Sequence, residues 1–199
     1  MEETRNRLRD AMLKRRSVLS PASRLAWSRL IQTKTLELPQ YLAARSIALY
    51  CAIQNEVETR AIMDDALRQK KKVFCPRLSG EEPAVFLQIF SEEDFRPGPR
   101  GMAEPSGDTR LSQTDCGSLI VVVPGVLFDG RGNRLGRGGG WYDRALQWFD
   151  DRGVFVGLGY EFQVIDRVPA QSWDEKVHYV ITESRVIDCG IPPHQRIAR

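Results

Sequence analysis

The run Leu119-Ile-Val-Val-Val123 constrains the fold of this chain more than any other segment. Four of its five apolar residues are β-branched, which is typical of a strand that is covered on both faces. Such strands occur in parallel sheets, where the connection between neighbouring strands is a crossover that usually contains a helix. The run therefore predicts an α/β fold with a buried, mainly parallel central sheet.

The segments on either side continue this pattern. Residues 46–51 and 73–75 predict strands, and Thr59 between them predicts the start of a helix, which is the spacing of a βαβ unit. Further strands are predicted at 84–90, 154–158 and 177–181, with an edge strand at 186–188, and further helices at 2–17, 21–36 and 141–150. Ser20 and Pro21 are the cap and first residue of the second of these helices, which should stop before Pro39. Residues 91–118 are rich in Gly, Pro, Ser and acidic residues and predict irregular surface. We expect a three-layer sandwich, with helices on both faces of one sheet, as a single domain over residues 1–199.

The composition is that of a globular protein, because 42% of the 199 residues are hydrophobic and 28% are charged. No apolar run approaches the roughly 20 residues that a membrane-spanning helix needs, and the charged start Met-Glu-Glu-Thr-Arg predicts no signal peptide. The four cysteines lie far apart in sequence and there are two histidines, which argues against a zinc site and for reduced thiols. We therefore expect a cytoplasmic protein with no membrane partner.

Positive charge is concentrated at the N-terminus. The net charge of the whole chain is +3, but residues 1–34 carry nine Lys and Arg against three Asp and Glu. This surplus indicates contact with phosphate groups, either of a nucleotide or of a nucleic acid. The chain contains no aromatic RNA-binding signature, so a nucleic-acid partner is not expected.

A glycine-rich loop follows the central strand and leads into the helix predicted from Trp141. Its core reads Arg134-Leu-Gly-Arg-Gly-Gly-Gly-Trp-Tyr-Asp143. Glycines allow backbone N–H groups to turn toward an anion, and the positive end of the helix adds to the attraction. Arg134 and Arg137 supply forked donors for phosphate oxygens, and Asp143 in the first helical turn could hold Mg²⁺. The pattern is neither a P-loop nor a dinucleotide-binding fingerprint. The alternative is a flexible connection whose arginines point into water.

The same residues resemble the signature of the 5-formyltetrahydrofolate cyclo-ligase family. Other parts of the chain resemble that family in the same order, and the match covers nearly the whole sequence. They are Arg5-Asn-Arg-Leu-Arg9, Tyr50 with Asn55-Glu56-Val57-Glu58-Thr59, Gly101-Met-Ala-Glu104-Pro105, and the single residues Gln163, Pro169, Asp174 and Thr182. Three positions depart from the common pattern: Arg5 stands in place of Lys, Trp141 in place of Tyr or Phe, and Gly139 where some members have Lys.

The resemblance implies a fold, a reaction and a set of roles. The fold is of the ribose-5-phosphate isomerase and CoA-transferase type. The reaction is the ATP- and Mg²⁺-dependent conversion of 5-formyltetrahydrofolate, with or without a polyglutamate tail, to 5,10-methenyltetrahydrofolate, with release of ADP and phosphate. In that reaction the formyl oxygen is phosphorylated and N10 then closes the ring. The implied catalytic residue is Arg137; the implied ATP contacts are Arg5, Arg9, Arg134, Leu135, Gly136, Arg137, Gly138, Gly139, Gly140, Trp141 and Tyr142; the implied folate contacts are Cys51 and Glu56; and the implied Mg²⁺ ligands are Asp143 and Asp174.

Each of these residues also has a purely structural interpretation. Arg5 and Arg9 could lie on a solvated helix face, Glu56 could be a loop carboxylate before a helix, and Asp174 could be a turn residue. Lys70–Lys72 indicates a helix end at the surface, and His178 indicates a structural histidine. Two other functions remain as alternatives: a non-catalytic binder of folate or nucleotide, and an RNA-binding role for the basic helix. We expect an enzyme that acts as a monomer.

Overall fold

The computed structural model describes residues 2–77, 85–98, 101–149 and 153–192. Its centre is a seven-stranded sheet with the order β11-β10-β9-β6-β1-β2-β3. The strands are β1 (Ser46–Ala48), β2 (Lys72–Arg77), β3 (Val85–Ile89), β6 (Leu119–Pro124), β9 (Gly153–Leu158), β10 (Tyr179–Ile181) and β11 (Val186–Asp188). The five inner strands pair in parallel, and the two edge strands β3 and β11 pair antiparallel. The predicted mainly parallel sheet is confirmed.

Strand β6 lies in the middle of the sheet, as the apolar run 119–123 predicts. Its side chains alternate between two hydrophobic clusters: Ile120 and Val122 belong to one, and Val121 and Val123 to the other. All four are at most 1% exposed. Both faces of the strand are therefore buried, which removes the need for polar residues at alternate positions.

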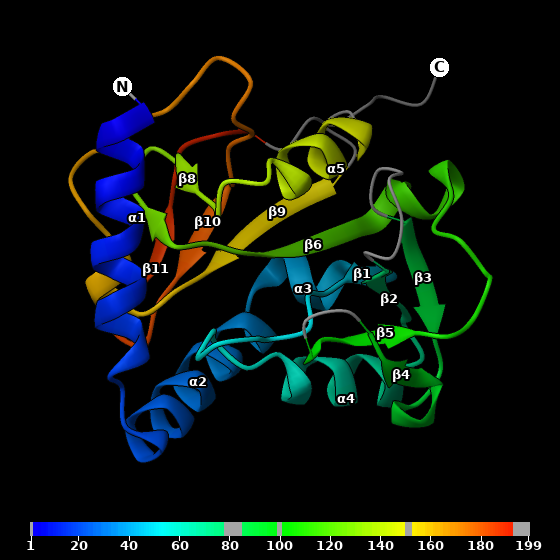
Figure 1. Ribbon diagram of the computed structural model, residues 1–199. Helices are drawn as coiled ribbons and strands as arrows, with labels where there is room; N and C mark the ends of the chain where they lie inside the picture. The colour runs from blue at the N-terminus through cyan, green and yellow to red at the C-terminus, as the bar shows by residue number, and fades with distance from the viewer. Residues whose placement is uncertain (1, 78–84, 99–100, 150–152, 193–199) are drawn as a thin grey trace.

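Helices cover both faces of the sheet. They are α1 (Glu2–Ser17), α2 (Pro21–Leu36), α3 (Pro39–Ala43), α4 (Arg60–Arg68) and α5 (Trp141–Phe149). In Figure 1, α2, α3 and α4 lie on one side of the sheet and α5 on the other, while α1 stands at one end. Ile31, Tyr41 and Ile62 from the first side and Leu146 and Phe149 from the second fill the two clusters. The α/β sandwich is thus confirmed.

Helix α1 packs against a small hairpin rather than against the main sheet. The hairpin is formed by β7 (Leu127–Phe128) and β8 (Arg134–Leu135), which pair antiparallel. Leu8, Met12 and Leu13 of α1 pack on a third hydrophobic cluster that contains Leu127 and Leu135. This contact places the basic N-terminal helix beside the glycine-rich loop that follows β8.

Several predicted ends are confirmed by their contacts. The Ser20 side chain accepts a hydrogen bond from the N–H of Ser23 and caps α2, whose first residue is Pro21. The side chain of Lys71 donates to the carbonyl oxygens of Tyr41 and Ala44 at 2.9 and 2.6 Å, so it ties the end of α3 to β2. His178 is buried and accepts from the N–H of Phe155, which is a structural role.

Other predicted boundaries were wrong. The first strand ends at Ala48 instead of residue 51, and the second continues through Pro76 to Arg77. The missing N–H of Pro76 costs the sheet little, because β1 ends opposite Phe74. The predicted end of α2 at Leu36 is confirmed, but the short helix α3 that begins at Pro39 was not predicted, although proline is well suited to the first helical turn.

The stretch 91–118 is more regular than its composition predicts. It holds the hairpin of β4 (Phe95–Pro97) and β5 (Ala103–Pro105), the 3₁₀ turns Glu92–Asp94 and Gln113–Ser118, and the paired Arg110. A further 3₁₀ turn spans Glu161–Gln163. The predicted strand start Ala84 and helix end Asp150 lie outside the described residues.

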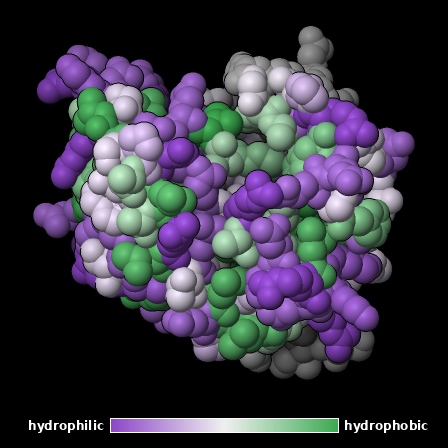
Figure 2. Space-filling model, turned by 90° about the horizontal axis from the view of Figure 1, so that it is seen from below, coloured by the Kyte–Doolittle hydropathy of each residue, from purple (hydrophilic) through white to green (hydrophobic). Residues whose placement is uncertain are grey.

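The surface on the side of α2 to α4 is mixed in polarity. Figure 2, which views the molecule from below, shows hydrophobic residues scattered among hydrophilic ones. Leu25 and Leu30 of α2 contribute to this, being 50% and 49% exposed. Among the described residues, no helix is long and apolar enough to cross a membrane.

Candidate active site

A cavity of about 640 Å³ lies at the carboxyl ends of the parallel strands. Tyr50 and Cys51 follow β1, Pro76 lies near the end of β2, and Gly125 follows β6, and all four line it. This edge of an open α/β sheet is where such folds bind ligands, because the loops that leave the strands diverge there. Helix α1 and the glycine-rich loop form further walls.

The glycine-rich loop presents its backbone to the cavity. Gly138 and Gly140 have φ angles of 102° and 62°, which only glycine adopts readily, and Gly139 lies between them. Among the described residues, the N–H groups of these three glycines donate to no protein acceptor. The loop leads directly into α5 at Trp141. Backbone N–H groups that have no protein acceptor and lie beside a helix N-terminus are suited to bind an anionic ligand.

Among the described residues five arginines line the cavity, and four of them, Arg5, Arg9, Arg134 and Arg137, are held by a protein partner. Arg9 donates from Nε to the carbonyl oxygen of Gly136 at 2.9 Å. Arg134 lies under the loop, only 2% exposed in its side chain, and forms an ion pair with Asp143 at 2.7 Å. Arg137 and Arg5 are held by Glu56 and Asp174, as described below. The cavity is therefore strongly basic at this end.

Arg5 and Asp174 form the most buried of these pairs. Arg5 donates to both carboxylate oxygens of Asp174, at 2.5 and 3.1 Å, and to the carbonyl oxygen of Pro169 at 2.6 Å. The hydrogen bond to Asp174 holds the pKa of Arg5 above its ordinary value. Burial alone would raise the pKa of Asp174, but the hydrogen bonds from Arg5 and from the N–H of Gln171 hold it below its ordinary value. The pair connects α1 to the loop before β10.

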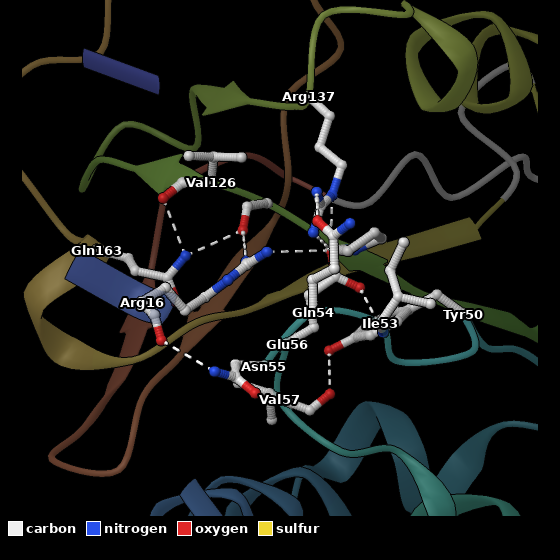
Figure 3. A network of polar contacts seen from close by, with 12 residues as sticks. Arg16, Tyr50, Ile53, Gln54, Asn55, Glu56, Val57, Val126, Arg137 and Gln163 are labelled. Atoms are coloured by element: carbon white, nitrogen blue, oxygen red, sulfur yellow. Dashed lines mark hydrogen bonds and ion pairs between the residues drawn. The ribbon is translucent and has the colours of Figure 1, made fainter. Parts of the chain in front are cut away.

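Glu56 holds Arg137, whose side chain points from the glycine-rich loop toward it in Figure 3. Its Oε1 accepts from Nε and Nη2 of Arg137, at 3.2 and 3.1 Å, and its Oε2 accepts from the N–H of Ile53 at 3.1 Å. A third cation, Arg16 of α1, lies 3.4 Å from the same Oε1. Arg137 also donates to the side chain of Gln54. The carboxylate is thus fixed in place at the wall of the cavity.

The wall beyond Glu56 is more apolar. The rings of Trp141 and Tyr142 meet edge to face with centroids 4.6 Å apart, and Trp141 also packs on Phe86. Burial raises the pKa of Tyr50 well above its ordinary value, so this phenol stays neutral while it donates to the carbonyl oxygen of Val57. Flat apolar walls next to a carboxylate suit an aromatic ligand with N–H donors.

The two carboxylates predicted as Mg²⁺ ligands differ in what they can offer. Among the described residues, no group of three His, Cys, Asp or Glu side chains could hold a metal ion alone. Mg²⁺ usually binds one or two carboxylates together with substrate phosphates, so this observation does not exclude it. Asp143 lines the cavity and engages one oxygen with Arg134, which fits this role. Asp174 engages both oxygens with Arg5 and Gln171, which favours a positioning role instead.

Cys51 reaches the cavity but is also tied to the core. It lines the cavity after β1. Interaction with the buried thiol of Cys75 in β2 lowers the pKa of Cys51 and, together with burial, raises the pKa of Cys75. Cys51, a predicted folate contact, therefore lies on the wall of the cavity.

The structure brings nearly all the predicted site residues together. The residues that line the cavity are Arg5, Arg9, Cys51, Glu56, Arg134, Gly136, Arg137, Gly138, Gly139, Gly140, Trp141, Tyr142, Asp143 and Asp174. Leu135 is the exception: its side chain is completely buried in the cluster under α1, because β8 turns it away from the loop. The predicted ATP contact by this side chain is not supported.

Sequence analysis missed other residues of the cavity. Met102, Glu104 and Trp173 line the cavity, and Arg16 contacts Glu56 of the cavity wall without lining the cavity itself. The segment 101–105 carried a signal, because it is part of the motif that resembles the family, but that motif alone assigns no role. Trp173 is 61% exposed at the rim, and nothing in its local sequence distinguishes it from a surface residue.

Comparisons with known proteins point to one family. A sequence model of the 5-formyltetrahydrofolate cyclo-ligase family matches residues 1–183. The chain is 30% identical to the 5-formyltetrahydrofolate cyclo-ligase of Haemophilus influenzae over 86% of its length and 94% of the relative. It is 31% identical to that of Mus musculus, over 88% and 92%. The solved structure of Aquifex aeolicus 5,10-methenyltetrahydrofolate synthetase is similar with a TM-score of 0.81 and 31% identity, covering 98% of this chain and 99% of the other.

Proposed function

Because this chain belongs to the 5-formyltetrahydrofolate cyclo-ligase family and has its activity, we propose that the cavity performs the reaction by phosphorylating the formyl oxygen with ATP. The observation that carries this mechanism is that one cavity joins a phosphate-binding end to an aromatic end with a carboxylate. The first end suits the triphosphate of ATP and the second suits the pterin of 5-formyltetrahydrofolate. This proposal assigns Trp141 and Tyr142 to the pterin, whereas the family resemblance implied that they contact ATP. The formyl group and the γ-phosphate would meet between them, near Arg137.

The proposed reaction has two steps. The formyl oxygen attacks the γ-phosphorus, the bond to the β-phosphate oxygen breaks, and ADP leaves. N10 then attacks the formyl carbon, the N10 proton is lost, and the carbon–oxygen bond breaks to release phosphate and leave the methenyl bridge. Phosphorylation is needed because the oxygen of an amide is otherwise a poor leaving group.

The protein contributes position and charge, which dominate phosphoryl transfer. The N–H groups of Gly138 to Gly140 and the guanidinium groups of Arg9 and Arg134 would hold the phosphates. Arg137 would leave Glu56 to neutralise the charge on the transferred group. Glu56 would then accept N–H donors of the pterin. Asp143 would hold Mg²⁺, which when bound neutralises charge on the phosphate oxygens.

An absorbance assay tests this proposal directly. The purified protein is mixed with 5-formyltetrahydrofolate, ATP and Mg²⁺, and the near-ultraviolet band of the methenyl product is followed, with ATP or metal omitted in parallel. We expect product only when both are present, and one ADP and one phosphate for each product. Product formation without ADP release would contradict the phosphorylation step.

A further inference from the structure

Arg16 is a cation that the reaction does not use directly, although it is placed beside a residue that it does use. Its side chain is only 2% exposed at the C-terminal end of α1. It donates to Oε1 of Glu56 at 3.4 Å and to the carbonyl oxygen of Gly125 at 3.3 Å, and its Nε has no hydrogen-bond partner among the described residues. Burial lowers its pKa below the ordinary value. Burying a guanidinium with so few hydrogen bonds carries a large desolvation penalty. This indicates that the positive charge of Arg16 has a function at this position.

Glu56 is paired with two arginines, the buried Arg16 and the more exposed Arg137. Arg137 is 33% exposed in its side chain and comes from the glycine-rich loop, whereas Arg16 comes from a helix that packs on the protein core. Both contact the same carboxylate oxygen. When Arg137 moves to a phosphate, Glu56 loses one cation and keeps the other.

The surrounding contacts hold Arg16 and Glu56 as one unit (Figure 3). The side chain of Asn55 donates to the carbonyl oxygens of Arg16 and Ser17, at 3.3 and 3.4 Å. Asn55 and Gln54 both adopt left-handed backbone conformations, with φ angles of 60° and 47°. Asparagine adopts this conformation more readily than most residues, but at Gln54 it is unfavourable and indicates that neighbouring contacts impose it. The end of α1 thus fixes the turn that carries Glu56.

We propose that Arg16 is a positioning residue that keeps the Glu56 side chain paired with a cation and aimed into the cavity when Arg137 leaves it for ATP. This inference rests on the proposed function, in which Glu56 contacts the pterin and Arg137 the transferred phosphate. It assigns Arg16 to folate binding rather than to nucleotide binding, although α1 also supplies Arg5 and Arg9 to the opposite end.

The first test compares three variants in steady-state kinetics. Arg16→Met removes the charge with a similar chain length, Arg16→Lys keeps a charge, and Arg15→Met is the matched control on an exposed neighbour. We expect Arg16→Met to raise KM for 5-formyltetrahydrofolate by about tenfold or more, as loss of a buried ion partner requires, with KM for ATP changed less than about twofold. Arg16→Lys should raise it only about threefold, and Arg15→Met should leave both values unchanged. Equal losses for folate and ATP would overturn the proposal.

A double-mutant cycle decides whether Arg16 acts through Glu56. In the Glu56→Gln background no carboxylate remains to be balanced, so Arg16→Met should change KM for folate less than about twofold. If the fold increases in KM for folate of the two single variants simply multiply in the double variant, Arg16 has a general structural role and the proposal is overturned. If circular dichroism shows that Arg16→Met does not fold, the same cycle with Arg16→Lys gives the same decision, because its threefold effect should vanish with Glu56→Gln.

Assaying the unmodified protein beside the Arg16 variants distinguishes a failure of the proposed role of Arg16 from a failure of the proposed function. If it forms methenyl product from folate and ATP while folded Arg16 variants keep its KM for folate, the role of Arg16 is wrong and the proposed function stands. If the unmodified protein forms no product, the proposed function falls, and the role of Arg16 falls with it.

Discussion

At the scale of single residues, most cations of the basic end of the cavity already have protein partners. Arg5, Arg134 and Arg137 are paired with Asp174, Asp143 and Glu56, respectively. These partners keep charged side chains oriented inside a partly buried site, where an unpaired charge would be costly. In the proposed reaction, ligand binding is therefore an exchange of partners, and it should be easiest for the most exposed of the three arginines, Arg137.

The first prediction concerns that exchange. Arg137→Ala should lower kcat by about two orders of magnitude or more, because a charge contact made in the transition state is lost. The methenyl absorbance assay at saturating ATP and folate measures it. Arg144→Ala is a useful comparison, since Arg144 also lines the cavity but lies within α5 and should have a much smaller effect. Near-normal turnover of Arg137→Ala would remove Arg137 from the mechanism.

A second prediction separates the two candidate metal ligands. Asp143→Asn should raise the Mg²⁺ concentration needed for half-maximal activity by about tenfold or abolish activity, because it weakens an oxygen ligand that faces the cavity. Asp174→Asn should change this requirement much less, since both oxygens of Asp174 are engaged by Arg5 and Gln171. A Mg²⁺ titration of both variants checks it. The opposite ranking would assign the metal to Asp174.

At the scale of elements, the glycine-rich loop combines two requirements. Its backbone must turn through conformations that other residues avoid, and Arg9 must approach it closely. A Cβ at Gly138 would lie 3.4 Å from Cζ of Arg9, whereas a Cβ at Gly139 would meet nothing within 4 Å. The two glycines are neighbours in sequence but differ in what a side chain would cost.

This difference gives a third prediction. Gly138→Ala places a side chain at a φ of 102° and should raise KM for ATP by about tenfold, since strain of this kind costs roughly 1–3 kcal/mol. Gly139→Ala should raise it less, because its φ is not positive and space is free. Steady-state kinetics with ATP as the varied substrate tests the pair. Equal effects would show that the loop's backbone conformation does not decide nucleotide binding.

At the scale of the whole molecule, the cavity is closed by segments that are distant in the sequence. Arg5 near the N-terminus is joined to Asp174, and α1 packs on the β7–β8 hairpin. Helix α1 and the loop before β10, which are far apart in the sequence, thus meet at one cavity. Loss of this connection should affect the stability of the fold as well as its activity.

The fourth prediction follows from the lowered pKa of Asp174. A carboxyl group whose pKa is lower in the folded state stabilises the fold above its unfolded pKa of about 3.9, and this contribution is lost as pH falls through the folded value. Asp174→Asn should therefore lower the free energy of unfolding at pH 7 by about 3 kcal/mol, as for a broken buried ion pair, and by much less near pH 2. Urea denaturation at both pH values measures this. A difference that does not shrink with acid would contradict the assignment.

The sequence by itself determined the features that neighbouring residues encode. The β-branched run at 119–123 predicted the central strand because burial on both faces leaves a continuous apolar pattern. The glycine-rich loop predicted an anion site because its special backbone and its arginines stand within ten residues of each other. The cap at Ser20 is likewise a contact between residues three positions apart.

The tertiary structure alone decided which charges meet. Nothing in the local pattern around Arg16 shows that it faces Glu56, forty positions away, or that Asp174 receives Arg5 instead of facing the cavity with free oxygens. The same holds for Leu135, whose direction depends on how α1 packs on β8. Such pairings arise when helices and loops pack on the sheet, and distances across that packing leave no period or spacing in the chain. The sequence therefore determines the elements and the kind of chemistry, while the packing decides the partner of each charged group.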